Sequence, residues 1–101
     1  MANPYRGEVE ISLGGEVYVM RLTLGVLAEL EADMKSDSLM AMVERFETGA
    51  FSARDLILLL SAGLRGGGAD PLPSLDIDGG PVVAAQAAAR LLRVTFAVPD
   101  A

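Results

Sequence analysis

Five consecutive apolar residues, Leu56 to Leu60, constrain this chain more than any other segment. They lie in an expected helix that begins after Ser52 and ends at three glycines, Gly66 to Gly68. A helix that is apolar on nearly every side cannot face water, so it must be buried in a core or against another protein. The pattern supports both destinations equally, and both can hold because a helix has two faces.

The length and composition fit one small domain spanning residues 1–101. Apolar residues make up 51% of the chain and aromatic residues only 5%, which suggests that part of the apolar surface is buried between molecules, including in a homo-oligomer. The net charge of −6 and the scattered basic residues argue against nucleic-acid partners and against an anionic membrane surface.

The chain has no cysteine and no histidine, so it lacks the commonest general base and the commonest transition-metal ligand. We therefore expect no enzyme activity, no cofactor and no metal. The first ten residues, MANPYRGEVE, have no apolar signal core, and no apolar run is long enough to span a bilayer. These features predict a cytoplasmic protein.

Residues 8–22 are predicted to form a two-stranded antiparallel β-hairpin. Polar and apolar residues alternate before Gly14-Gly15, and β-branched and aromatic residues follow it. Two adjacent glycines favour a tight hairpin turn because both can adopt positive φ. The second strand is apolar on both faces, which makes Val17 and Val19 candidates for core or partner contacts.

Four helices are predicted to follow the hairpin. Thr23 is a candidate N-cap for the first helix, and Ser52 with Asp55 forms a candidate capping box for the third. Residues 66–80 are predicted to be a loop, with a mobile joint at Gly66–Gly68 and a hinge within residues 69–80. Residues 98–101 are expected to fray. The expected helices cover residues 24–34, 39–48, 53–65 and 81–96.

Helical spacing predicts which faces are buried. The first helix has a stripe of leucines and alanine, and the second has a buried face that leaves Arg45 on its outer side. The leucines at 56, 60, 64, 91 and 92 are candidate core or partner-contact positions. The predicted stripe of the first helix is Leu24, Leu27, Ala28 and Leu30.

Three motifs are better explained by structure than by chemistry. The segment Asp76–Gly80 resembles the start of a calcium loop, but the position that needs a glutamate is Ala87, so an acidic turn is favoured. Gly66–Gly68 follows a helix and precedes no Lys-Ser/Thr pair, which excludes a P-loop. Glu29, Glu31 and Asp33 do not share one helix face, which indicates a solvated surface.

In the order of several short motifs, the chain resembles a protein family that is found in bacterial gene transfer agents and in related gene clusters of tailed phages. The motifs are Arg6-Gly7-Glu8, Leu22-Thr23-Leu24-Gly25, Leu27-Ala28-Glu29-Leu30-Glu31, Arg45-Phe46 and Ser52-Ala53-Arg54-Asp55. The family is assigned to phage tail assembly, usually as a tail-assembly chaperone and sometimes as a tail tube protein. The resemblance covers about residues 3–68 well and the last helix more loosely.

The leading hypothesis is a non-enzymatic α+β domain, a hairpin followed by about four helices in a small bundle. The resemblance implies a tail-assembly chaperone that binds apolar helices of the tape-measure protein while tube subunits polymerise around it. A structural tail subunit retained in the virion-like particle is the alternative. A small regulatory or ligand-binding module is a remote third, because few polar groups converge on a pocket.

Overall fold

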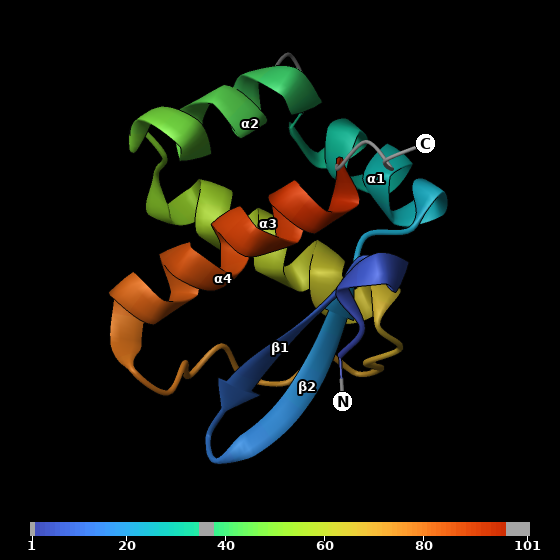
Figure 1. Cartoon of the computed structure of the whole chain (residues 1–101), viewed down its shortest axis with the longest axis vertical. Coiled ribbons are helices and arrows are strands. Elements are labelled where there is room, and N and C mark those ends of the chain that lie inside the picture. The colour runs from blue at the N-terminus through green and yellow to red at the C-terminus, as the bar shows by residue number, and fades with distance from the viewer. Residues whose placement is uncertain (1, 35–37, 97–101) are drawn as a thin grey trace.

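The computed structural model describes residues 2–34 and 38–96, so the break at residues 35–37 and the expected fraying at 98–101 lie outside the described residues. The predicted α+β architecture is confirmed: a two-stranded antiparallel hairpin is followed by four helices (Figure 1). The elements are η1 (Pro4–Arg6), β1 (Glu8–Leu13), β2 (Glu16–Arg21), α1 (Leu24–Met34), α2 (Leu39–Thr48), α3 (Ala53–Gly66) and α4 (Gly80–Thr95).

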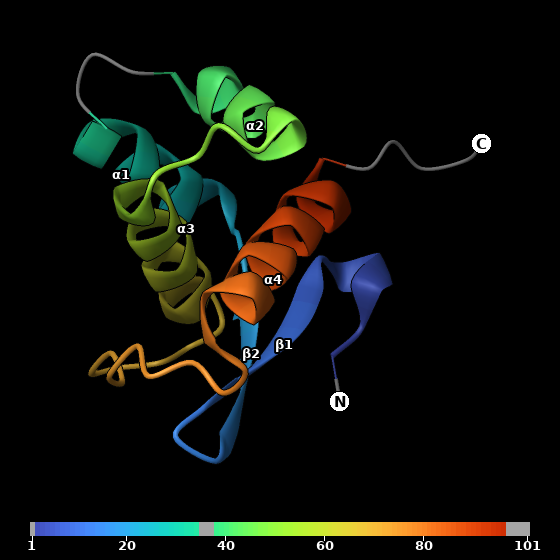
Figure 2. The ribbon, with the colours of Figure 1, turned by 90° about the vertical axis from the view of Figure 1, so that its left-hand side faces the viewer.

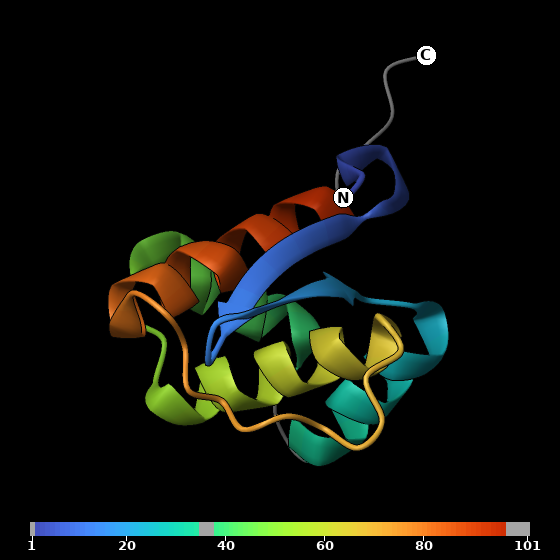
Figure 3. The same ribbon diagram turned by 90° about the horizontal axis from the view of Figure 1, so that it is seen from below.

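The hairpin packs one face on α3 and α4. Gly14 and Gly15 form its turn with φ of +58° and +86°, and the register pairs Leu13 with Glu16. Side chains alternate between the two faces of a strand, which points the apolar residues of β1 inward. Figure 3 shows α4 beside β1 and α3 beside β2. The buried hairpin side chains are Val9, Ile11, Leu13 and Met20.

The glycines at the end of α3 allow the helix to touch β2 through the backbone. A Cβ atom on Gly66 would lie 1.7 Å from the carbonyl oxygen of Arg21, and one on Gly67 would lie 1.8 Å from that of Val19. No side chain larger than hydrogen fits at such distances. The expected mobile joint is therefore wrong at these two positions, because both are packed against a strand.

The third helix has a buried side and an exposed side. Leu59, Leu60 and Leu64 are fully buried, whereas Ile57 is 54% exposed. The expectation that the apolar run is buried on nearly every side is wrong at Ile57, because α3 packs against β2, α1 and α4 and Ile57 lies on its remaining, exposed side. One side of α3 thus belongs to the domain core.

The first helix is rotated relative to the predicted stripe. Val26, Leu30 and Met34 are buried, whereas Leu24 is 84% exposed and Ala28 is also exposed. The buried residues recur every four positions, which places them on one face of the helix. The predicted stripe is therefore wrong at Leu24 and Ala28.

The connection from α3 to α4 is anchored to the hairpin. Ile77 forms an antiparallel bridge with Leu13, and the Asp78 amide donates a hydrogen bond to the Ser12 carbonyl at 3.0 Å. Figure 2 shows the connection running along the ends of α3 and α4 that lie nearest the hairpin turn. Residues 76–78 are thus held to the end of β1 by backbone hydrogen bonds, so this part of the expected hinge is anchored. In the described part of the chain, no helix is both long and apolar enough to cross a membrane.

Candidate functional site

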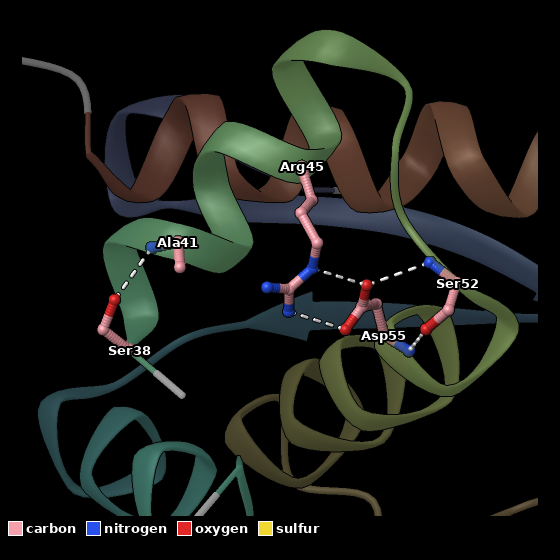
Figure 4. Close-up of polar contacts among 5 residues, drawn as sticks. All are labelled: Ser38, Ala41, Arg45, Ser52 and Asp55. Atoms are coloured by element: carbon pink, nitrogen blue, oxygen red, sulfur yellow. Dashed lines mark hydrogen bonds and ion pairs between the residues drawn. The ribbon is translucent and has the colours of Figure 1, made fainter. Parts of the chain in front are cut away.

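Helix α2 is held in place by caps at both ends. The Ser38 hydroxyl accepts a hydrogen bond from the Ala41 amide at 3.0 Å (Figure 4). Gly49 adopts φ of +80°, and its amide donates to the Arg45 carbonyl. These caps end α2 after ten residues and turn the chain back toward α3.

An ion pair connects α2 to the start of α3. Arg45 donates from Nε to Oδ2 of Asp55 and from Nη2 to Oδ1, both at 2.8 Å (Figure 4). Asp55 also accepts from the Ser52 amide at 2.9 Å, while its own amide donates to the Ser52 hydroxyl at 3.1 Å. The predicted capping residues thus form a reciprocal box, and the same carboxylate binds Arg45 in a bidentate pair.

The environment of Asp55 favours its charged form. Its side chain is nearly buried, with 7% of the residue exposed. The Arg45 guanidinium lowers the pKa of the Asp55 carboxyl, burial opposes this shift, and the Ser52 amide adds to it. The prediction that Arg45 lies on the outer side of α2 is therefore wrong. Gly49 reverses the chain and brings Asp55 beside Arg45, which precedes it by ten residues.

An open groove lies between α2 and α4. It has a volume of about 720 Å³. Phe46 is fixed at the groove by stacking on Phe51, with ring centroids 4.8 Å apart. The groove is lined by Val43, Phe46, Glu47, Gln86, Ala89, Arg90, Leu92, Arg93 and Phe96.

The two walls of this groove carry opposite charge. Glu47 stands on the α2 wall, and Arg90 and Arg93 stand on the α4 wall. All three residues are exposed, and none makes an ion pair within the part of the chain that the structure describes. The groove therefore presents an apolar floor between an acidic wall and a basic wall, with no charges neutralised across it.

The predicted contact residues divide between core and surface. Leu60, Leu64 and Leu91 are buried in the core, while Leu92 is 4% exposed and contributes to the groove floor. Leu56 is half-buried against the core.

The two candidates on the hairpin differ from each other. Val17 is 65% exposed on the outer face, and Val19 is half-buried. The predicted cap of α1 accepts a hydrogen bond at the Thr23 hydroxyl from the Val26 amide at 3.2 Å. Neither strand of the hairpin contributes a residue to the groove.

Sequence reasoning missed the groove as a site. A usable signal was present on α4, where Gln86, Ala89, Arg90 and Arg93 recur at helical spacing on the side away from the buried alanines. On this face two exposed arginines accompany Ala89, whereas the opposite face of α4 carries the buried alanines.

The acidic turn before α4 has a structural role. Asp78 accepts hydrogen bonds from the Ser12 hydroxyl and from the Gly15 amide, the latter at 2.9 Å. The Ser12 hydroxyl lowers the pKa of the Asp78 carboxyl most strongly, and the Gly15 amide adds to this effect. Within residues 2–34 and 38–96, no three carboxylates are grouped closely enough to hold a metal ion.

These features define a small α+β domain whose most distinctive surface is an open groove between helices. The family model described as phage tail tube protein, GTA-gp10, matches residues 6–98, and the chain belongs to that family. The match extends through α4, beyond the segment in which the sequence resemblance is strongest. No curated protein and no solved structure gives a significant match.

Proposed function

We propose that this protein is a non-enzymatic tail-assembly chaperone that binds apolar helices of the tape-measure protein before the tube is built. The observation that carries the proposal is the groove between α2 and α4. Its floor holds Val43, Phe46 and Leu92, yet nothing in the described part of the chain fills it. Membership of the phage tail family supports a role beside other tail components.

The dimensions of the groove suit a helix as its occupant. Its α4 wall extends from Gln86 to Phe96, which corresponds to roughly 15 Å along a helix axis, or about three turns. A helix with an apolar stripe fits such a groove by placing one side chain per turn on the floor. A tape-measure protein rich in such helices needs its apolar stripes shielded from water while it is outside the tube.

The chaperone proposal predicts direct binding to the tape-measure protein. Purified, tagged protein would be mixed with the tape-measure protein encoded in the same gene cluster and, separately, with the tube subunit. Retention of the tape-measure protein, together with its increased solubility on co-expression, supports the proposal. If neither protein is retained, the chaperone function is wrong.

A second candidate is a structural subunit retained in the tail. The description of the family as tail tube proteins favours it, and so does the outer face of the hairpin, where Val17 is 65% exposed. In a particle, a second copy or another tail protein would cover this face. Mass spectrometry of purified particles separates the candidates, because a structural subunit is present in stoichiometric amounts and a chaperone is absent.

A further inference from the structure

We propose that the groove between α2 and α4 selects an amphipathic helix that carries acidic side chains along one flank of its apolar stripe and basic side chains along the other. This inference deepens the proposed function and rests on it for the identity of the partner. The observation behind it is the arrangement of opposite charges on the two walls.

The α4 wall supplies the positive side. Arg90 and Arg93 are three residues apart, so they project from neighbouring turns of the same helix face. Both are exposed, and neither has an ion-pair partner among residues 2–34 and 38–96. Two of the eight basic residues of a chain with net charge −6 are thus concentrated on this wall. Acidic side chains on a docked helix would pair with them.

The α2 wall supplies the negative side. Glu47 lines the groove, and Glu44, also exposed, precedes it by about one helical turn. A helix with acidic residues on both flanks would be attracted by the α4 wall and repelled by the α2 wall. A helix with basic residues on both flanks would be repelled by the α4 wall and attracted by the α2 wall. A helix with one flank of each sign satisfies both walls, and the charges also set its direction along the groove.

The floor explains why the occupant is a helix with an apolar stripe. Ala89 is small and permits close approach of a backbone, while Phe46 from α2 and Leu92 from α4 offer larger apolar surfaces. Phe96 remains 42% exposed at the end of α4. Met40 is 62% exposed and lies one turn before Val43, on the same side of α2. Exposed methionine adapts to different apolar partners, which suits a binder of many related helices.

The test uses three synthetic helical peptides with one apolar stripe and different flanks. One peptide has both flanks acidic, one has both flanks basic, and one has a flank of each sign. Binding to the intact protein is measured by fluorescence anisotropy at two salt concentrations. We expect the mixed peptide to bind about tenfold more tightly than either of the others, with a preference that weakens as salt rises.

Charge-reversal variants then test the two walls separately. Arg90→Glu/Arg93→Glu makes both walls negative and should shift the preference to the basic peptide. Glu47→Lys makes both walls positive and should shift it to the acidic peptide. Arg54→Glu is the matched control, since Arg54 is exposed on α3 outside the groove and makes no ion pair in the described chain. Circular dichroism verifies that each variant is folded.

The outcomes distinguish this inference from the proposed function. Equal binding of the three peptides, or a preference that Arg54→Glu changes as much as the groove variants do, would overturn the inference. The inference also fails if the tape-measure protein is retained by wild-type and groove variants alike, since the chaperone then binds it elsewhere. If the peptides behave as expected and the tape-measure protein is not retained, the inference stands and the chaperone function fails.

Discussion

Helices α3 and α4 both support the hairpin, but they differ in what covers their other sides. α3 packs against β2, α1 and α4 and leaves a narrow exposed side at Ile57, and the Arg45–Asp55 pair links α2 to its first turn. α4 buries one face against the hairpin and α3 and leaves its other face along the open groove. The difference indicates that α3 is the structural scaffold of the domain, whereas α4 contributes an exposed surface that is available for binding.

The largest expected effect comes from Gly66→Ala, which tests whether α3 is the rigid scaffold. The new Cβ would lie 1.7 Å from a backbone oxygen of β2, and the strand cannot retreat without breaking the hairpin. We expect a loss of at least about 4 kcal/mol in unfolding free energy, above the usual cost of overpacking. Urea unfolding measures it.

Gly25→Ala is the matched control for this substitution. Gly25 lies in α1 with nothing within 4 Å of the position of its Cβ, so alanine should stabilise the protein by up to about 1 kcal/mol. If both substitutions have the same effect, the close contact between α3 and β2 is not present in solution.

Asp55→Ala should have the next largest effect, because it removes the fastening between α2 and α3. It leaves the Arg45 guanidinium without its bidentate partner and also removes a helix cap. We expect a loss of about 3 kcal/mol in unfolding free energy. The neighbouring Arg54→Ala is the control, and a change within about 0.5 kcal/mol is expected there because Arg54 is exposed.

The same ion pair makes stability depend on pH in a defined direction. The pKa of Asp55 is lower in the folded protein than in the unfolded chain, mainly because of Arg45. Its contribution is therefore complete above the unfolded value of about 3.9 and is lost as the pH falls through the folded value. Unfolding measured between pH 7 and pH 3 should show the difference between wild type and Asp55→Asn shrinking in acid. A constant difference would contradict the assignment.

A smaller, local effect is expected at the joint between the hairpin and α4. Asp78→Ala removes the acceptor of the Gly15 amide, so hydrogen exchange at Gly15 should become several-fold faster. Asp76→Ala is the control, since only the backbone of Asp76 bonds to the hairpin. Equal exchange in the two variants would show that the Asp78 carboxylate does not hold the turn.

The smallest effect on stability is expected in the groove itself. Arg90→Glu/Arg93→Glu alters exposed side chains without ion pairs in the described chain, so the unfolding free energy should change by no more than about 1 kcal/mol in total. Thermal unfolding checks this. A large loss would mean that α4 uses these arginines for folding, and the contrast with α3 would disappear.

The elements of this fold were predictable because their signals are local. Gly14-Gly15 marks the hairpin turn, and Ser52 and Asp55 mark the start of α3 through residues only three apart. The faces of the helices were less predictable, because burial depends on neighbours that are distant in sequence. Leu24 fits an apolar stripe by spacing, yet it is 84% exposed.

The site was harder to predict than the fold for the same reason. The Arg45–Asp55 pair requires the reversal of the chain at Gly49, and the groove requires α2 and α4 to lie side by side although about forty residues separate them. The glycines after α3 signalled the end of a helix, but their contact with the carbonyls of β2 depends on tertiary packing.

The hydrogen bonds between Ser12 and Asp78 have a consequence for the order of events during synthesis. They join residues that are 66 positions apart, and α4 begins just after Asp78 in the chain. The N-terminal two-thirds of the nascent chain lacks one entire wall of the groove. The groove therefore forms only after α4 has been synthesised and has docked beside α2 and the hairpin.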